Sequence, residues 1–575
     1  MDPLIRFGAF ELDRSSGELR KDGAKLRAQG QPLRILEALI DAGGAIVTRE
    51  DLRARLWSDD TFVDFDNSLN NAVNRLRAAL GDEAGSPKYI ETVGRRGYRF
   101  IGTLAAGNRA AAPARTRLGV LPFRMLRADD EVEFLTSSLP DALAASLSGL
   151  ESIAVRSPIA ARRFAEEEPD LSAIAAALDI NLVLAGSILR SANRVRIASQ
   201  LVEVPGGRLL WTHTAETALS DLFALQDELT TRIVESLSVP LSVREHQLLH
   251  HDVPSSGHAY EQYLRANRFA ETATTWADAK ELYLQVIRED PHYAPAWARL
   301  GRIYRLMAKY AAGESRQWRA LAEESFRRAL SLNPELSVAH HYYAQLEMET
   351  GRTREALVRL AGRAREHPAD PQIFAGLVQA CRYGGLLDES LAAHERARRL
   401  DPNVPTSVAY TLWALGDREQ ALETCGMTAE PFRGFILAAL GRVDEARAAL
   451  RDARALYGAY PLETMFIDAM SAVLHKDRDA VGECIDALFR TDFSDPEGIY
   501  FAAVLSMRVG DVERAERALI IASEKGFASL PQLQNDPMLA PLQSSPRCAR
   551  VREEIGKRHR EAAAAFEAAG GAALF

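Results

Sequence analysis

Cysteine is scarce in this sequence, and its four residues follow no pattern. Cys381, Cys425, Cys484 and Cys548 are spread over the last 200 or so of the 575 residues, and no two have the CxxC spacing. A disulfide framework and a zinc site built on paired cysteines are therefore excluded as organising features. We expect reduced thiols, as in a cytoplasmic protein.

Long apolar stretches are absent as well. No run of 18 apolar residues occurs, and the apolar segment LVLAGSIL (182–189) is short and contains Gly and Ser. The first residues, MDPLIRFGAF, do not show the basic and then apolar order of a signal peptide. We therefore expect a cytoplasmic protein that has no membrane partner.

Phosphate-binding and nucleophile motifs are also missing, because GxxxxGK, GxSxG and GxGxxG do not occur. We expect no enzyme activity, no cofactor and no metal. Two polar clusters leave alternatives open. The carboxylates of the first are helix-dipole partners or line a metal or phosphate-acceptor pocket. The histidines of the second belong to a solvated helix end or form an i, i+4 pair of metal ligands. We favour the first alternative for each, and we expect His213 to be structural. The clusters are Asp129, Asp130, Glu131 and Glu133, and His246, His250, His251 and Asp252.

The net charge of −9 does not suit a protein that binds a polyanion over its whole surface, so a nucleic-acid function would have to be local. At 575 residues the chain is too long for one hydrophobic core. The change of sequence pattern along the chain predicts a multidomain protein. Its parts are a first domain at 1–104, a linker at 105–117, an α/β domain at 118–250 and a helical array at 255–565.

The first 104 residues have the element order of a winged helix. FGAFELD and GELRKDG alternate apolar and polar residues, which predicts a small antiparallel sheet. Helices are predicted at 32–42 and after Thr48, where Asp51 completes a capping box. After the helix at 67–80, PKYIETVGRRGYRFIG predicts a hairpin with Arg95 and Arg96 at its tip.

The segment NSLNNAVNRLRAAL (67–80) predicts a helix with two different sides. At about 100° per residue, one narrow stripe is apolar and the opposite face is polar. Asn can pair bidentately with adenine and Arg with guanine in the major groove, so the polar face suits a helix that reads DNA. The stripe is Leu69, Val73, Leu76 and Leu80, and the opposite face is Asn67, Asn71, Asn74, Arg75 and Ala78.

The segments REDLRARLW, VDFDNSLNNAVNRLRAALGD and YIETVGRRGYRF together resemble the OmpR/PhoB-type winged-helix family, over nearly all of residues 1–103. In that family the third helix enters the major groove of double-stranded DNA and the hairpin wing touches the adjacent minor groove. The resemblance implies base contacts for two residues of the helix, phosphate contacts for two more, and wing contacts for three arginines. These are Asn71 and Arg75, then Asn74 and Arg77, then Arg95, Arg96 and Arg99.

Charge within this region is polarised. Residues 1–104 hold 16 Lys+Arg and 16 Asp+Glu, whereas residues 67–100 hold six basic and three acidic residues. Phosphate neutralisation supplies most non-specific affinity for DNA, so one copy should bind weakly. We expect two or more copies side by side on repeated half-sites, as a homo-oligomer on DNA.

The acidic loop SDDTFVDFD (58–66) has two interpretations. In the family that the region resembles, the corresponding loop can contact RNA polymerase. The alternative, which we favour, is that Phe62, Val63 and Phe65 close the core beneath the helix at 67–80, because apolar loop residues are usually buried.

The middle region alternates strands and helices and predicts an α/β layered domain with a mixed sheet. Its segments VLPF, LVLAGSILR, VRIASQLVEVPGGRLLWT and DLFALQDEL resemble the TolB amino-terminal-like domain, over about 117–240. That resemblance implies little about function, because the domain is known chiefly as a module of larger assemblies.

The helical region contains a repeat. WARLGRIY places Trp297, Leu300, Gly301 and Tyr304 in the W-x2-L-G-x2-Y signature of a tetratricopeptide unit. Small residues that mark the second helix of such units recur eight times, and four of the seven steps between them are 34 or 35 residues. These anchors are Ala279, Ala322, Ala356, Ser390, Ala421, Ala446, Ala480 and Ala515.

A repeat array of this kind presents a concave groove, usually for a protein or peptide. HHYY (340–343), RRALSL (327–332) and HERARRL (394–400) could line such a groove. The interpretation that we favour for each residue is that aromatics pack between helices and arginines form solvated faces.

The sequence thus predicts a transcription regulator that binds promoter DNA through its winged helix and a protein or peptide through its repeats. The rival is an interaction scaffold whose winged helix no longer reads DNA, since Asn stands at 71 and 74 where Arg or His is frequent in the family. A third option, an enzyme in the α/β domain, has no nucleophile or metal constellation to support it.

Overall fold

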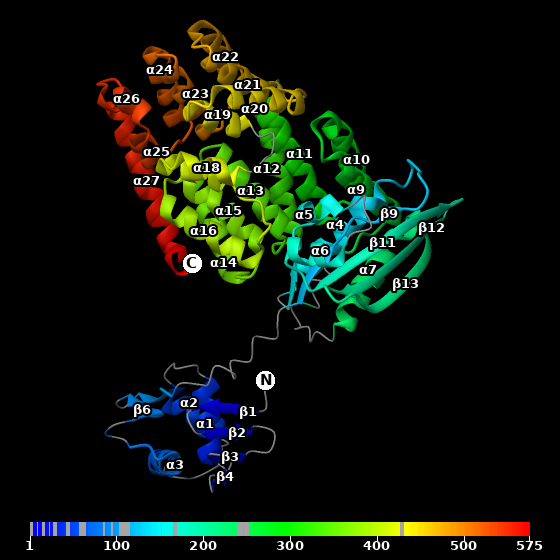
Figure 1. Cartoon of the computed structure of the whole chain (residues 1–575), viewed down its shortest axis with the longest axis vertical. Helices are drawn as coiled ribbons and strands as arrows, with labels where there is room; N and C mark the ends of the chain where they lie inside the picture. The colour runs from blue at the N-terminus through cyan, green and yellow to red at the C-terminus, as the bar shows by residue number, and fades with distance from the viewer. Residues whose placement is uncertain are drawn as a thin grey trace. The chain divides into compact units, whose positions relative to one another are not determined.

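The computed structural model divides the chain into two compact units, Met1–Arg115 and Thr116–Phe575 (Figure 1). Arg95, most of the acidic loop 58–66, most of the linker 105–117, and His246, His250 and His251 lie outside the described residues. Among the described residues, no helix combines the length and the apolar character that a bilayer crossing requires. The described residues are 4–7, 10–13, 18–21, 24–26, 31–41, 47–56, 65–83, 85, 87–93, 96–102, 116–150, 152–164, 170–192, 194–237, 245, 252–311, 313–425 and 431–575.

The first unit begins with the expected antiparallel sheet and continues with three helices and a hairpin. The sheet has the order β1-β2-β3-β4, and a second sheet has the order β5-β7-β6. Its elements are β1 Leu4–Phe7, β2 Phe10–Asp13, β3 Glu18–Lys21, β4 Ala24–Lys25, α1 Gln31–Asp41, β5 Val47–Thr48, α2 Arg49–Leu56, α3 Phe65–Leu80, β6 Ile90–Val93 and β7 Gly97–Phe100.

The predicted capping box at the start of α2 is confirmed. Thr48 Oγ1 accepts a hydrogen bond from the backbone N–H of Asp51 at 3.1 Å, and the Asp51 carboxylate accepts one from the Thr48 N–H at 3.2 Å. The two side chains also bond to each other at 2.7 Å. Two backbone donors that the helix leaves without partners are thereby satisfied.

The second unit opens with a six-stranded mixed sheet, as the sequence predicted. Strands β10, β8 and β11 pair in parallel, whereas β11, β12 and β13 pair antiparallel, and β9 pairs with β11. The elements are β8 Thr116–Val120, β9 Arg124–Met125, α4 Leu135–Ser148, β10 Ile153–Val155, α5 Pro158–Ala161, α6 Leu171–Leu178, β11 Leu182–Ser191, β12 Arg194–Glu203, β13 Arg208–Ala218 and α7 Leu222–Ser236.

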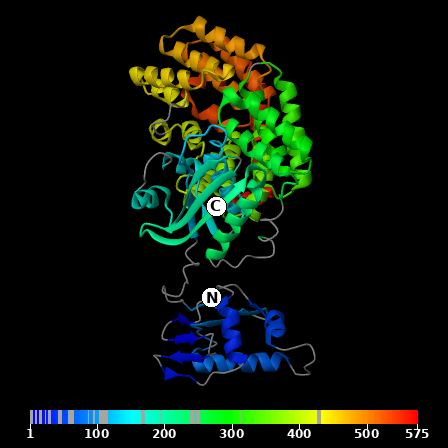
Figure 2. The same ribbon diagram turned by 90° about the vertical axis from the view of Figure 1, so that its right-hand side faces the viewer.

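Helices cover both faces of this sheet. Neighbouring residues of β11 point to opposite faces and therefore belong to different cores. Leu184 belongs to the core that includes α4 and α7, whereas Val183 belongs to the core that includes α6. The first of these cores continues without a break into the first helices of the array, where it includes Tyr260 and Tyr283. Figure 2 shows the strands in cyan and teal beside these green helices.

The rest of the chain folds as helix pairs, which confirms the predicted helical array. The pairs are α9 Gly257–Phe269 with α10 Trp276–Glu289, α11 Ala294–Tyr310 with α12 Ser315–Leu332, α13 Ser337–Glu349 with α14 Thr353–Glu366, α15 Pro371–Tyr383 with α16 Leu387–Leu400, α17 Val408–Leu415 with α18 Arg418–Thr424, α19 Pro431–Ala439 with α20 Val443–Leu456, α21 Pro461–Leu474 with α22 Arg478–Arg490, and α23 Pro496–Arg508 with α24 Val512–Glu524. Shorter helices α25 Leu530–Asn535 and α26 Ala540–Ser544 precede the long helix α27 Ala549–Ala568.

The eight small anchors lie where the repeat pattern placed them, each on the second helix of a pair. Seven of the eight have no exposed surface, and Ala480 is the partly buried exception. A further small residue, Gly301 on the first helix of its pair, marks a similar close approach: a Cβ atom there would lie 2.7 Å from the ring of Phe326 on the second helix. The pairs therefore approach closely at these points, which is the packing of tetratricopeptide-like repeats.

The α/β sheet is fixed to the array at two separate places. One is the continuous core that joins α4 and α7 to α9. The other is at the end of α16, where the Asp401 carboxylate accepts a hydrogen bond from the Ser157 N–H at 2.9 Å and Asn403 donates to the Ala177 carbonyl at 3.0 Å. The sheet therefore bridges the first and the fourth repeat.

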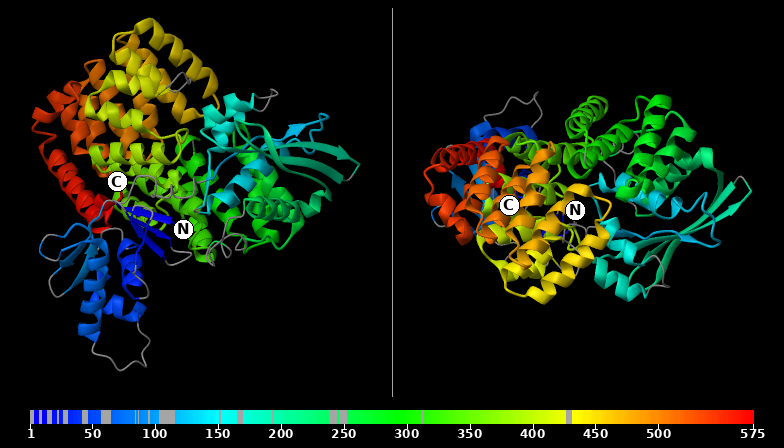
Figure 3. Two further views of the ribbon diagram at one scale, coloured as in Figure 1. Left: turned by 60° about the horizontal axis from the view of Figure 1, so that its bottom comes forward. Right: turned by 90° about the horizontal axis from the view of Figure 1, so that it is seen from above.

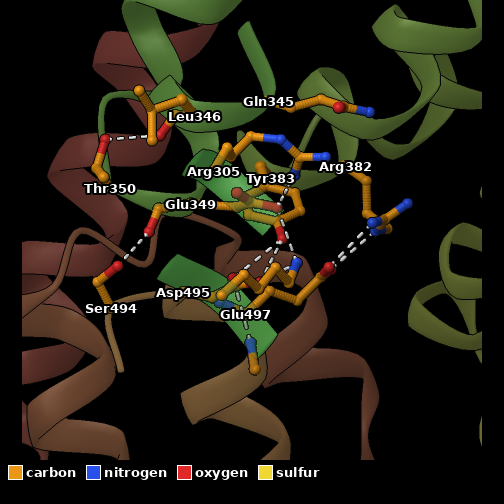
Figure 4. Close-up of polar contacts among 12 residues, drawn as sticks. Arg305, Gln345, Leu346, Glu349, Thr350, Arg382, Tyr383, Ser494, Asp495 and Glu497 are labelled. Atoms are coloured by element: carbon orange, nitrogen blue, oxygen red, sulfur yellow. Dashed lines mark hydrogen bonds and ion pairs between the residues drawn. The ribbon is translucent and has the colours of Figure 1, made fainter. Parts of the chain in front are cut away.

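The array also returns on itself, and a buried ionic network joins its early and late repeats (Figure 4). Lys309 of α11 forms ion pairs with Glu349 of α13 at 3.0 Å and with Asp495, which precedes α23, at 2.8 Å. Arg382 of α15 binds both carboxylate oxygens of Glu497 at 2.8 and 2.9 Å. The concave side of repeats two to four is therefore in part filled by the start of α23.

Helix α27 also packs against an early repeat. It packs beside α14 (Figures 1 and 3), and the His559 ring lies 2.8 Å from the Gly384 carbonyl oxygen. One hydrophobic core runs from Ala344 in α13 to Phe566 in α27. We call this packing of α23 and α27 onto the early repeats the closure of the array; the sequence did not predict it.

The buried pair between Arg382 and Glu497 gives a test of this closure. Both side chains are almost fully buried, so Arg382→Met leaves a carboxylate without its counter-charge and should lower the free energy of unfolding of the array by about 3–5 kcal/mol. Arg454→Met is the matched control, because Arg454 and Asp468 form a half-exposed pair worth about 0–1 kcal/mol. Urea unfolding of the intact chain, followed by circular dichroism, measures both; equal shifts would contradict the closure.

Candidate DNA-binding surface

Helix α3 has the two sides that its sequence predicted. Leu69, Val73, Leu76 and Leu80 are at most 3% exposed and pack in the core of the first unit. On the other side Asn71, Asn74, Arg75 and Ala78 are exposed. Asn67 lies within α3, but its side chain is outside the described part of the structure. Two amides and one guanidinium therefore share one accessible face.

Arg77 corrects the expectation of a phosphate contact. Its side chain is only 7% exposed, and the guanidinium donates hydrogen bonds to the Ile90 carbonyl at 2.9 Å and to Thr92 Oγ1 at 2.8 Å. The physical reason is its angle on the helix, since Arg77 lies only about 40° from Val73 and leans toward the buried side. Arg77 thus joins α3 to the hairpin instead of facing solvent.

Asp82 fixes the same hairpin from the end of α3. Its buried carboxylate accepts hydrogen bonds from the backbone N–H groups of Lys88 at 2.5 Å, Tyr89 at 3.3 Å and Ile90 at 2.8 Å. The sequence showed Asp82 only as one acidic residue in a charge count. Its position directly after the left-handed Gly81 was the available signal, because an Asp there can accept from the chain that follows a turn.

Asn70 is the one described asparagine of α3 that has a structural role. Its side-chain oxygen accepts hydrogen bonds from Arg49 at 3.1 Å and from the Tyr98 hydroxyl at 2.8 Å. Arg49 also donates to the Tyr98 hydroxyl at 3.2 Å. This triad joins the start of α2, the middle of α3 and strand β7, and sequence reasoning did not single it out.

The predicted hairpin is present, and its strands pair Val93 with Gly97 across the turn. Of the three predicted wing arginines, Arg96 is exposed at the tip, and Arg99 is partly exposed and donates to Glu91 at 2.7 Å. Arg95 lies outside the described residues. Gly97 lies very close to β5, since a Cβ atom built on it would be 2.1 Å from the Val47 carbonyl oxygen. Only glycine allows this close approach of the hairpin to the rest of the unit.

Three of the other polar residues that the sequence raised, Asp129, Glu131 and His213, lie near a charged partner. Arg190 lies 3.3 Å from Asp129 and 2.5 Å from Glu131, and His213 lies 3.4 Å from Glu228.

A group of possible metal ligands, Glu335, Glu366 and His367, surrounds the Arg363 guanidinium. The guanidinium lies 3.3 Å from Glu335, 2.8 Å from Glu366 and 2.6 Å from the His367 ring. Because the positively charged guanidinium occupies the middle of the group, we interpret these residues as an ionic cluster and not as a metal site.

Comparison with known families identifies the first unit. Residues 23–100 match the model of the family "Transcriptional regulatory protein, C terminal". Residues 23–100 form an OmpR/PhoB-type winged-helix domain. In this winged-helix domain, α3 occupies the place of the third helix and the β6–β7 hairpin that of the wing.

Relatives of known name match different parts of the chain. The putative adenylate cyclase 3 of Rhizobium meliloti is 26% identical over 323 residues, which are 55% of this chain and 51% of that protein. The phosphate regulon transcriptional regulatory protein PhoB of the same organism is 32% identical over 98 residues, 17% of this chain and 42% of that protein. The sensory transduction protein BceR of Halalkalibacterium halodurans is 50% identical over 64 residues, 11% of this chain and 27% of that protein. The chain thus spans about half the length of these relatives or less.

Among solved structures, the APC/C hetero-tetramer Cut9-Hcn1 aligns with 61% of this chain and 84% of that chain, at 12% identity and a TM-score of 0.30. The description of the array as tetratricopeptide-like therefore depends on its own helix pairs and buried anchors.

The contrast between two arginines of α3 gives a test of this geometry. Arg77→Met removes two hydrogen bonds to β6, one to a backbone carbonyl, and should lower the local stability of the hairpin by about 1–3 kcal/mol. Arg75→Met, on the exposed face, should change it by less than about 0.5 kcal/mol. Hydrogen exchange of the peptides that cover β6 and β7 measures both variants, and the expectation is wrong if both hairpins exchange alike.

Proposed function

We propose that the protein is a DNA-binding transcriptional regulator in which α3 lies in the major groove of promoter DNA. The observation that carries this proposal is the exposed face of Asn71, Asn74 and Arg75 on a helix whose other side is fixed in the core. The match of residues 23–100 to a transcriptional regulatory family supports it. Recognition requires a helix held at a constant angle, and Arg77, Asp82 and the core provide that constraint.

The proposed roles of single residues follow from their places. Asn71 and Arg75, with Asn67 one turn before, are assigned to base edges, and Asn74 to a phosphate. Arg95, Arg96 and Arg99 are assigned to the wing, where Arg99 would have to exchange its bond to Glu91 for a bond to DNA. Arg77 is not assigned to DNA.

We further propose that the second unit binds a protein or peptide partner and that copies of the chain assemble on DNA. Repeat arrays of this kind expose large surfaces for other proteins. A contact between RNA polymerase and the acidic loop 58–66 belongs to the same proposal; the loop carries four carboxylates.

We infer that the chain is not an enzyme. The activity in the name of the putative adenylate cyclase 3 belongs to a protein of which this chain covers 51%. Among the described residues, Asp129 and Glu131 pair with Arg190, and the Glu335 cluster surrounds Arg363, so both groups have the character of ion pairs.

DNA binding by the intact chain tests the proposal against the alternative of a scaffold that no longer reads DNA. Selection of genomic fragments should give a preferred site, for which Arg75→Ala should lose about 1–3 kcal/mol of discrimination. Arg96→Ala should instead lower the slope of log affinity against log salt by about one. Arg20→Ala, the same charge change on the N-terminal sheet, is the control. Absence of any salt-dependent binding by the wild-type chain would favour the scaffold.

Stoichiometry is a separate expectation. Because the winged-helix region has no net positive charge, a single copy should bind weakly at physiological salt, and two adjacent half-sites should bind two copies together. Titration of DNA that carries one or two half-sites, followed by analytical ultracentrifugation, measures this. Nanomolar affinity for one half-site would contradict it.

A further inference from the structure

Helix α11 carries a stripe of cations that its neighbours do not fully neutralise. Arg299, Arg302 and Arg305 are three residues apart and therefore lie along one side of the helix. Arg305 pairs with Glu349 at 2.6 Å. Among the described residues, Arg299 and Arg302 have no carboxylate within ion-pair distance.

The acidic groups around this stripe are already engaged. Asp141 accepts a hydrogen bond from Arg162 at 2.8 Å, and Glu349 is shared by Arg305 and Lys309. Two positive charges on α11 therefore remain without a fixed counter-charge.

Tyr342 of α13 lies beside the guanidinium groups of Arg299 and Arg302, and Arg302 also donates to the Ala270 carbonyl at 3.2 Å. Arg299 donates to the Tyr342 hydroxyl at 3.3 Å, and the Arg302 guanidinium lies 5.6 Å from the centre of the tyrosine ring. Burial by itself would raise the pKa of Tyr342, but Arg299, Arg302 and Arg305 lower the pKa below its ordinary value. The site thus has a positive potential that is strong enough to outweigh the effect of burial.

Buried polar atoms beside Tyr342 have unused hydrogen-bonding capacity. Nε of Arg299, Nδ1 of His341 and Oε1 of Gln345 are buried without a hydrogen-bond partner. Burial, together with Arg305 and Arg302, lowers the pKa of His341 to about 4, so its ring is neutral near pH 7 and can donate one hydrogen bond. Such groups are usually satisfied, by protein or by a bound molecule.

Residues of the late repeats pack around the C-terminal end of α11. On one side, Tyr460 of α21 packs against Trp276 and Tyr310 with ring centres 5.1 and 5.7 Å apart. On the other side, Ser494 donates to the Glu349 carbonyl at 3.0 Å (Figure 4). Both contacts lie near the Arg305 end of the stripe, which is therefore covered by residues of the late repeats.

We propose that Arg299, Arg302 and Tyr342 form a site for a small anion with at least two negative charges on carboxylate or phosphate oxygens. The two guanidinium groups supply charge-assisted hydrogen bonds and the tyrosine hydroxyl supplies a third donor. This site is independent of whether α3 reads DNA.

The test is isothermal titration of the intact chain with inorganic phosphate and with succinate, at constant ionic strength set by chloride. The two probes distinguish phosphate from carboxylate chemistry, and saturable binding of either is expected. Arg299→Gln and Arg302→Gln should each weaken it by about ten- to a hundredfold, because each removes hydrogen bonds between charged groups. Arg328→Gln removes an exposed arginine of α12 and should leave the affinity unchanged.

A second measurement keeps the test valid if a variant loses structure. The bound anion should raise the pKa of Tyr342, which appears as a shift in phenolate absorbance that Tyr342→Phe lacks. Arg302→Lys keeps the charge and should retain part of the affinity. The proposal is overturned if neither probe binds, or if Arg299→Gln and Arg302→Gln bind the probes as tightly as the wild-type chain does.

Discussion

The burial of one side of α3 is the constraint on which the DNA-binding surface depends. Each of Leu69, Val73, Leu76 and Leu80 contributes about 1.5–3 kcal/mol by leaving water. A rotation of the helix by one residue would replace these four side chains by two amides, an arginine and a glycine, and would cost more than a single base contact provides. The core therefore decides which residues face outward, and Asn71, Asn74 and Arg75 are the ones that remain.

Local patterns predicted the elements of this surface well. The apolar stripe of α3, the capping box of Thr48 and Asp51, and the hairpin all follow from spacing within a few residues. The roles of Arg77, Asn70 and Asp82 do not, because each bonds to a residue on another element. A polar residue on the flank of a helix can face water or a neighbouring strand, and only the fold decides between these. The assignment of Asn71, Asn74, Arg75, Arg96 and the other predicted contacts to DNA stays a prediction.

The repeat array shows the same limit on a larger scale. The positions of the repeats could be predicted from the sequence, because each unit needs one small residue where two helices touch. The closure of the array could not, because the course of a superhelix depends on small rotations that add up over several repeats. The pairing of Lys309 with Asp495 and of Arg382 with Glu497 joins residues more than a hundred positions apart. No periodicity in the sequence connects them, and the expectation of a concave groove came from the general form of such arrays.

The attachment of the α/β sheet to the first and the fourth repeat has a mechanical consequence. A free array of helix pairs is elastic, since its pitch changes when neighbouring pairs turn slightly against each other. The bonds of Asp401 and Asn403, together with the shared core at α9, set the distance between the two ends of this four-repeat segment. That segment cannot stretch or twist unless one attachment breaks, so it should transmit a force applied at either end as a rigid lever.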